Sequence, residues 1–350
     1  MKKKRMSRGR MFFNVILSIF IIVFLVAMGL LINPMRTLRS LRKVDDHPLW
    51  EMTYYGGYSF LPKTIEDQHK FASMFGGTYP GENGNCSIFV AMGEGGHKVY
   101  GRNYDWTETP AMLLKIDPPG GYASISVLSL DLYGFTPKDD LFQLPFLPRI
   151  VLLFSPIITL DGMNEYGLTV AIANVPTTSV PKDPDKKSVN SPTVLRLLLD
   201  NARNVDEALK ILAEYNITDP WLPGHYLLAD PSGKSVVVEF LDGKMQVIPN
   251  IQPWQAITNF YITRDTGEVD PNDNWGHGRL NLITRSMEKT QGVATAEDAL
   301  GILKSVSLPG TQWSVVYDMS SGDVKIAMGH NYEVVYSSFE DEGEVMSFRI

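Results

Sequence analysis

The order of the predicted strands and helices limits the fold of this 350-residue chain more than any other sequence feature. Strands come first, two helices capped by Ser191 and Asn204 follow, strands return, and two further helices precede the last strands. The predicted strands are 86–92, 97–103, 122–130, 168–175, 225–230, 234–241, 244–249, 312–319, 323–328 and 332–338, and the later helices are 278–290 and 296–306. A parallel βαβ protein would alternate strands with helices. This order therefore predicts an α+β fold with antiparallel sheets covered by helices.

An apolar run of 21 residues, 12–32, lies between two basic clusters near the N-terminus. At about 1.5 Å per helical residue, it would cross the roughly 30 Å hydrocarbon core of a bilayer. A signal peptide would have a shorter apolar segment with a small-residue cleavage site directly after it. The only such candidate, Ala27-Met28-Gly29, still has Leu30 to Ile32 after it. Residues 12–32 therefore predict a single-pass transmembrane helix, with a cleaved signal and a secreted protein as the alternative.

Charge is divided unevenly along the chain. Residues 1–43 contain ten basic residues and no acidic one, so a total net charge of −7 leaves −17 on residues 44–350. Six of the basic residues precede the apolar run, which predicts a cytoplasmic N-terminus and an extracytoplasmic body at the cell membrane. Because an acidic body repels polyanions, nucleic-acid binding is not expected.

The single cysteine, Cys86, follows a Gly-Glu-Asn-Gly-Asn loop and begins a predicted strand. One cysteine cannot form an intramolecular disulfide or a cysteine-ligated metal cluster, and a small buried side chain is its ordinary interpretation. At this junction, however, the chain could be cut between Asn85 and Cys86. The freed α-amino group, with a pKa near roughly 7.7–8.0, would then be a base for the thiol of the same residue.

Arg102 and Asp105 come at the end of the following predicted strand. If 86–92 and 97–103 form a hairpin, both side chains return beside Cys86. Arg102 would then stabilise a thiolate, and Asp105 would orient the α-ammonium group or the thiol. Taken alone, the pair has an ordinary alternative interpretation as a surface ion pair.

Four separated motifs resemble those of the N-terminal-nucleophile (Ntn) linear amide C–N hydrolases, the superfamily of choloylglycine hydrolases, penicillin V acylases, acid ceramidase and the N-acylethanolamine amidase. They are Cys86 with Gly101-Arg102-Asn103-Tyr104-Asp105; Asp161-Gly162-Met163-Asn164-Glu165-Tyr166-Gly167-Leu168 followed by Asn174; Ala256-Ile257-Thr258-Asn259; and Gly278-Arg279-Leu280. The resemblance extends over about 86–340.

This resemblance implies an αββα four-layer sandwich, self-cleavage before Cys86 and hydrolysis of a linear, non-peptide amide. The catalytic residues that it implies are Cys86, Arg102, Asp105, Asn174, Asn259 and Arg279, with the Asn259 side chain and the Asn174 backbone N–H binding the oxyanion. Residues 49–58 resemble the pro-segment of the ceramidase branch, whose cut fragment stays associated. The expected division is therefore a basic tail and anchor at 1–32, a pro-segment or linker at 33–85, and an Ntn-hydrolase domain at 86–350.

The predicted partner is a small-molecule amide, in particular an N-acyl amide. The apolar segment 141–160 is either ordinary core or, for a lipid-like substrate, the rim of an acyl-chain pocket or a lid on the membrane. The histidines lack metal-ligand spacing and no phosphate loop is found, so no cofactor is expected. Acyl transfer to an amine and a binding protein without catalysis are the alternatives.

Overall fold

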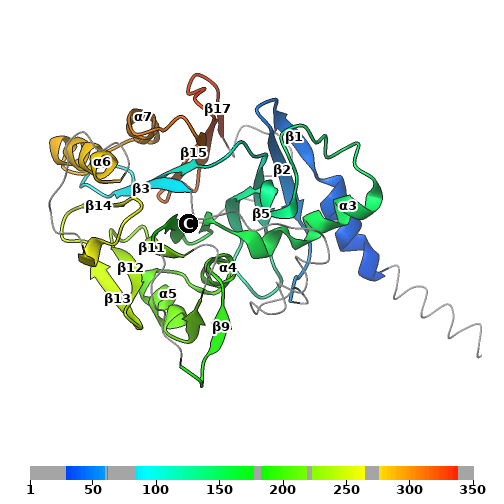
Figure 1. The fold of residues 1–350 in the computed structure, drawn as a ribbon, viewed down its shortest axis with the longest axis horizontal. Helices are drawn as coiled ribbons and strands as arrows, with labels where there is room; N and C mark the ends of the chain where they lie inside the picture. Colours follow the sequence, from blue (N-terminus) through cyan, green and yellow to red (C-terminus); the bar gives the residue numbers. More distant parts are fainter. Residues whose placement is uncertain are drawn as a thin grey trace, which may run out of the picture.

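The computed structural model describes residues 29–59, 61, 84–176, 183–218, 223–264 and 276–337. In this part of the chain, two large sheets face each other and a small two-stranded sheet lies beside them (Figure 1). The small sheet pairs β9 (Lys187–Val189) with β10 (Tyr215–Ile217) in parallel.

The larger sheet has nine strands in the order β1-β2-β5-β6-β7-β8-β11-β12-β13. Their bounds are β1 (Arg42–Asp45), β2 (Leu49–Tyr54), β5 (Ala111–Ile116), β6 (Ser124–Ser129), β7 (Asp161–Asn164), β8 (Thr169–Asn174), β11 (Gly224–Ala229), β12 (Ser235–Leu241) and β13 (Lys244–Pro249). All neighbours are antiparallel except β2 and β5, which run parallel. Residues 42–54, in the predicted pro-segment, thus supply the two strands at one edge.

The second sheet has six antiparallel strands in the order β14-β3-β4-β15-β16-β17. Their bounds are β14 (Trp254–Ile257), β3 (Asn85–Ala91), β4 (Val99–Asp105), β15 (Thr311–Asp318), β16 (Val324–Met328) and β17 (Val335–Ser337). The predicted hairpin of Cys86 is the β3–β4 pair, in which Ile88 lies opposite Arg102.

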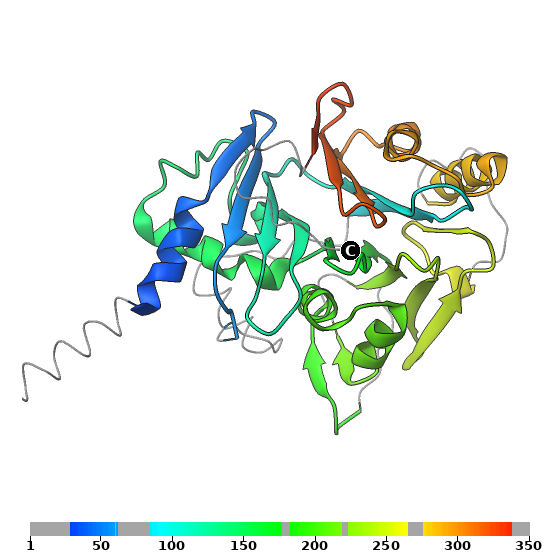
Figure 2. The same cartoon turned by 180° about the vertical axis from the view of Figure 1, so that it is seen from behind.

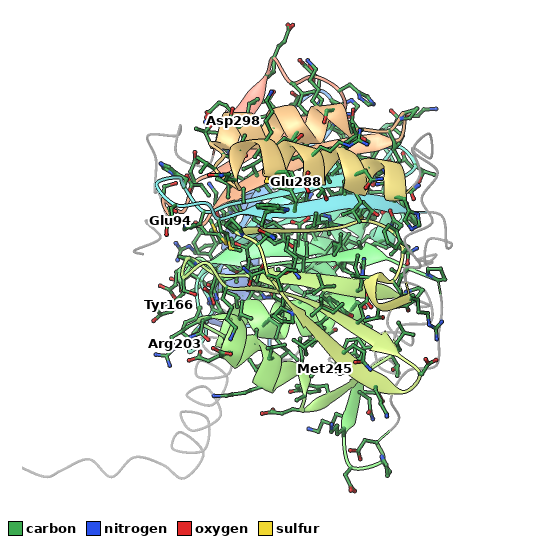
Figure 3. All side chains as sticks on the ribbon, turned by 90° about the vertical axis from the view of Figure 1, so that its left-hand side faces the viewer. Glu94, Tyr166, Arg203, Met245, Glu288 and Asp298 are labelled. Carbon is green, nitrogen blue, oxygen red and sulfur yellow. The ribbon has the colours of Figure 1, made fainter. Side chains whose placement is uncertain are left out.

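Helices cover the outer faces of both sheets. Helices α6 (His277–Thr290) and α7 (Ala296–Ser305) pack on β3, β4, β14 and β15, and α4 (Ser191–Asn201) packs on β7, β8 and α5 (Val205–Leu212). Figure 3 shows these layers from the side, with Glu288 of α6 and Asp298 of α7 above the sheets and Arg203, between α4 and α5, below. The predicted α+β class with antiparallel sheets is confirmed.

Short helices fill the connections: α3 (Phe146–Ile150) and the 3₁₀ turns η1 (Leu130–Tyr133), η2 (Val151–Ile158) and η3 (Ile262–Arg264). The apolar segment 141–160 therefore becomes mainly α3 and η2. Two of its buried members, Leu141 and Leu152, join Trp50 and Met52 of β2 in one apolar cluster, whereas Leu160 belongs to the main core.

The main core lies between the two sheets and is built from alternate residues of facing strands. Tyr100 of β4 and Val315 of β15 meet Ile172 of β8 and Leu227 of β11 in one cluster, and none of them is more than 1% exposed. Central strands such as β3, β8 and β12 are buried at every position, because both of their faces are covered, and this explains the nearly continuous apolar runs in the sequence.

Several boundaries differ from the sequence predictions. The strands that were not predicted are β1, β2, β5, β7, β9, β10 and β14. β5 is rich in helix-favouring Met and Leu, and β7 contains Gly162 and Asn164, so pairing with neighbouring strands overrides local propensity in both. The prediction that Ser191 caps its helix is also wrong: Asn190 is the cap, since its side chain accepts from Thr193 N, whereas the Asn204 cap is confirmed.

Residues 29–39 are helical, and their first residues are exposed. Among the described residues, no helix combines the length and the apolar character that crossing a bilayer requires. The predicted transmembrane segment lies outside the described residues as far as residue 28, so it stays a prediction.

Candidate active site

Cys86 lies near the start of β3, facing the core between the sheets, and is 5% exposed. An N-terminal nucleophile works through its nitrogen and its sulfur, and both atoms of Cys86 have a hydrogen-bond partner. The backbone nitrogen of Cys86, an amide in the intact chain, donates to Asn259 Oδ1 at 2.8 Å, and Arg102 Nη2 donates to Cys86 Sγ at 3.5 Å. The structure therefore brings Arg102 to the thiol, where the hairpin argument expected it.

Arg102 is fixed by a buried carboxylate. Its Nη1 donates to Asp161 Oδ2 at 2.5 Å and to Leu160 O at 2.8 Å, and the hydroxyl of Tyr317 donates to Asp161 Oδ1. The side chains of this ion pair are 1% and 0% exposed. Since both hydrogens of Nη1 have acceptors, Nη2 stays directed at Cys86.

Arg279, in the first turn of α6, contacts the backbone carbonyl of the same cysteine. Its Nη1 donates to Cys86 O at 2.7 Å and to Ser87 Oγ at 2.9 Å, and its Nη2 donates to Asn259 Oδ1 at 3.0 Å. Arg279 Nη1 also lies 3.5 Å from Asp105 Oδ2. Asp105 is thus held by Arg279, and by Thr311, whose Oγ1 donates to Asp105 Oδ1 at 2.5 Å.

Asn259 joins Cys86 to Asn174. Its Nδ2 donates to Asn174 O at 2.8 Å and, at 3.4 Å, to Gly84 O, two residues before the cysteine. Val175 N donates to Pro223 O, on the β11 edge of β8. Because successive residues of a strand direct their backbone groups to opposite edges, the N–H and carbonyl of Asn174 point to the other edge of β8. Of the residues singled out in the sequence, Arg102, Asn259 and Arg279 therefore contact Cys86 directly, whereas Asp105 is linked to it through Arg279 and Asn174 through Asn259.

Burial dominates the electrostatics of this cluster. It raises the pKa of the Cys86 thiol, with Arg102 opposing the rise and Asp105 adding to it. It also raises the pKa of Asp105 to about 6, against the opposing effects of the Thr311 hydrogen bond and of Arg279. The thiol thus needs its cationic neighbours and a nearby base to react as a thiolate.

The residues just before Cys86 occupy part of the site. A Cβ on Gly84 would lie 1.9 Å from the indole of Trp106, so only glycine fits against this ring. Trp106 in turn stacks on Tyr104, which stacks on Trp313. In the intact chain, the end of the pro-segment therefore covers an aromatic surface beside the nucleophile.

Replacing Asp105 by asparagine should raise stability at alkaline pH while it lowers activity. Because the folded-state pKa of Asp105 lies above the ordinary value of 3.8, the wild type loses stability as pH rises through about 6, and the variant does not. Above about pH 6, the free energy of unfolding of the variant should exceed that of the wild type by at most about 3 kcal/mol, less the cost of weakening the contact with Arg279. Thermal unfolding should show the Asp105→Asn advantage growing between about pH 4 and pH 6 and staying constant up to pH 8; parallel curves over the whole range would contradict it.

Asp161 belongs to one of the sequence motifs, but Tyr317, Thr311 and Ser87 belong to none and were not expected at the site. Their partners lie far away in the sequence, and only the β4–β15 pairing brings Thr311 opposite Asp105. The one sequence signal that could have pointed to Asp161 was its charge directly after the apolar segment 141–160. In the described part of the chain, no three His, Cys, Asp or Glu side chains gather in a way that could hold a metal ion.

Comparison with known proteins gives one family match. The family model described as acyl-coenzyme A:6-aminopenicillanic acid acyl-transferase matches residues 154–332, which is just over half of the chain.

Curated relatives match over shorter stretches. A penicillin V acylase from Pectobacterium atrosepticum is 32% identical over 113 residues, covering 29% of this chain and 30% of that protein. A bile salt hydrolase/transferase from Clostridium perfringens is 36% identical over 100 residues, covering 26% and 30%. The matches thus span about a third of the length of these relatives.

Among solved structures, a mutant of the conjugated bile acid hydrolase from Clostridium perfringens superposes with a TM-score of 0.55 at 16% identity, covering 74% of this chain and 94% of that one. At this identity the likeness concerns the fold. It agrees with the two facing antiparallel sheets and their helix layers.

Proposed function

This chain belongs to the acyl-coenzyme A:6-aminopenicillanic acid acyl-transferase family, among the Ntn linear amide C–N hydrolases, and we propose that it hydrolyses N-acyl amides through Cys86. One observation carries the proposal: Arg102, Asn259 and Arg279 each contact the cysteine, at Sγ, at its nitrogen and at its carbonyl. A cysteine kept only for packing would not need polar groups at all three places.

The first step would be self-cleavage. Cys86 Sγ attacks the carbonyl carbon of Asn85, the C–N bond to Cys86 breaks, and the nitrogen takes up the thiol proton to become the α-amine. Water then hydrolyses the thioester, releasing residues 1–85 with a new carboxylate. The hydrogen bond from the Cys86 nitrogen to Asn259 Oδ1 supports this order of steps, because it orients the leaving nitrogen.

In the mature enzyme, the α-amine takes the thiol proton and the thiolate attacks the amide carbonyl of the substrate. The substrate oxyanion would receive hydrogen bonds from Asn259 Nδ2 and the Asn174 N–H; loss of one such donor typically lowers turnover by roughly 10²–10³. The contact of Asn259 Nδ2 with Gly84 O supports this role, since a carbonyl already lies there in the intact chain. The protonated α-amine then gives its proton to the leaving amine, and water hydrolyses the thioester.

Acyl transfer is the second candidate, and the description of the matching family as an acyl-transferase favours it. The same thioester would be attacked by an amine instead of water. Adding an amine acceptor to the assay distinguishes the two, because a transferase forms the new amide at the expense of the free acid.

Long-chain N-acyl amides are the substrates that we expect. Each methylene that enters an apolar pocket contributes up to roughly 0.8 kcal/mol, or about fourfold in kcat/KM. For a series of N-acyl amides, kcat/KM should rise steeply with chain length and then level off. A flat series, or a preference for glycocholate or penicillin V, would contradict this.

From the apolar segment 141–160, Phe142, Phe146 and Phe154 would be the aromatic candidates for such a pocket, but we do not assign them to it. Phe142 contacts Trp50 with ring centroids 5.2 Å apart, and Phe154 packs on the same cluster, whereas Cys86 belongs to the core between the sheets. Phe146 is 67% exposed. This favours the alternative that part of 141–160 faces the membrane.

We place the protein at the cell membrane, anchored through residues 12–32 with the catalytic domain outside the cytoplasm. Support comes from exposed apolar side chains at the end of the molecule where the chain leaves this segment: Leu30, Leu31, Ile32 and Met35, with Phe142 and Phe146. The helix 29–39 and α3 both lie at the end that carries β1 and β2 (Figure 2). A protein secreted after signal cleavage remains the alternative.

A further inference from the structure

A buried histidine and glutamate lie directly behind the segment that carries Asn259. His225 of β11 and Glu239 of β12 both have side chains that are 0% exposed, and His225 Nδ1 lies 3.1 Å from Glu239 Oε1. Burying two ionisable groups together is costly unless each is fully hydrogen-bonded. Their remaining partners therefore indicate what the pair is for.

All of these partners lie on the turn around Asn259. His225 Nε2 donates to the carbonyl of Thr258, the residue before Asn259, at 2.7 Å. Glu239 accepts from Ile262 N at 2.6 Å through Oε1, and from Thr263 N at 3.1 Å and Thr263 Oγ1 at 2.5 Å through Oε2. The turn is thus held on both sides of Asn259 by one pair of side chains.

The hydrogen bonds also determine the charge of the pair. Thr258 O is an acceptor, so Nε2 of His225 carries a hydrogen. Both oxygens of Glu239 accept from the backbone N–H groups of Ile262 and Thr263, which favours the ionised carboxylate with Nδ1 of His225 donating to it. Burial would raise the pKa of Glu239, but the hydrogen bonds from His225 and Thr263 outweigh burial and hold it below its ordinary value.

We infer that His225 and Glu239 form an imidazolium–carboxylate pair that positions Asn259 against Cys86. Asn259 Oδ1 contacts the Cys86 nitrogen and its Nδ2 contacts Asn174 O, so a small displacement of the turn would disturb both contacts. His225 and Glu239 are thus positioning residues that act through Asn259. The inference deepens the proposed function, because it concerns the same reaction.

The test replaces Glu239 by glutamine. Its amide group would face the N–H donor of Thr263 and leave the imidazolium without a counter-charge, so the turn should shift. We expect kcat for an N-acyl amide to fall by about tenfold to a hundredfold, with KM within about threefold and self-cleavage slowed in parallel. If Glu239→Gln does not fold, Thr263→Val, which removes one donor to Glu239 Oε2 without burying a charge, should show a smaller loss of the same kind.

Asp200→Asn is the matched control. Asp200 accepts hydrogen bonds from Tyr58 and Arg196 on α4, away from Asn259, so this variant should lose stability and keep the wild-type kcat. If Glu239→Gln and Asp200→Asn both keep the wild-type kcat, the pair is only structural and the inference is overturned.

A readout without substrate separates this inference from the proposed function. In protein labelled with ¹⁵N-histidine, the His225 ring, identified by its loss in His225→Gln, should show both nitrogens protonated at neutral pH. A neutral tautomer would overturn the inference even in an active enzyme. If no N-acyl amide is hydrolysed, the proposed function fails, while the ring signals still decide the charge of the pair.

Discussion

Replacing Cys86 by alanine should leave the 39.2 kDa chain uncut and abolish turnover. Wild-type protein should convert to a species that begins at Cys86, because the thiol is both the nucleophile of self-cleavage and the source of the mature N-terminus. No other cysteine is present to replace it. Intact-mass analysis and N-terminal sequencing of both proteins measure the outcome. Cys86→Ser should be cut slowly, since a hydroxyl is a weaker nucleophile than a thiol.

Met112→Leu serves as the control for this experiment. Met112 of β5 is as buried as Cys86, is a sulfur-containing side chain, and belongs to a different apolar cluster. It should be cut as the wild type is. An active preparation that contains only intact chains would refute the N-terminal mechanism for Cys86.

The released fragment 1–85 should stay bound to fragment 86–350 and hold it at the membrane. Strand β2 pairs with β5 along its whole length, from Leu49 opposite Ala111 to Tyr54 opposite Ile116. Side chains on both faces of β2 are buried, and Glu51 pairs with Lys115 at 3.0 Å. Cleavage before Cys86 removes a peptide bond but none of these contacts.

The variant Trp50→Ala tests the strength of this association. Trp50 is 1% exposed, and removing such a side chain from a core costs about 3–5 kcal/mol, or roughly 5–10 °C in Tm for a domain of this size. The cleaved variant should release fragment 1–85 on gel filtration, whereas the wild type and Trp50→Phe should keep both fragments in equal amounts.

In membranes, the wild-type catalytic fragment should sediment with the bilayer after cleavage and be digested by protease added outside the cell. Recovery of fragment 86–350 in the soluble fraction, with fragment 1–85 in the membrane, would contradict the association. Protection of fragment 86–350 until the cells are lysed would reverse the proposed topology.

The order of elements was readable from the sequence because most strands are apolar runs bounded by turn residues. The prediction of strands failed where a strand forms only because it pairs with neighbouring strands. β5 has the composition of a helix and becomes a strand between β2 and β6, while β2 belongs to a segment that was expected to be a connector. Pairing partners that lie far apart in the chain leave no local pattern, so these strands could not be predicted.

The sequence by itself determined which residues meet at the site, since Cys86, Arg102, Asp105, Asn174, Asn259 and Arg279 all stand in short motifs. Only the tertiary structure decided what supports them: Tyr317 behind the Arg102–Asp161 pair, Thr311 beside Asp105, and His225 with Glu239 behind Asn259. Nucleophilic catalysis requires particular residue types at fixed positions, so its residues form recognisable sequence motifs. A supporting hydrogen bond can come from any strand that the fold brings near, so it leaves no trace at a given spacing in the sequence.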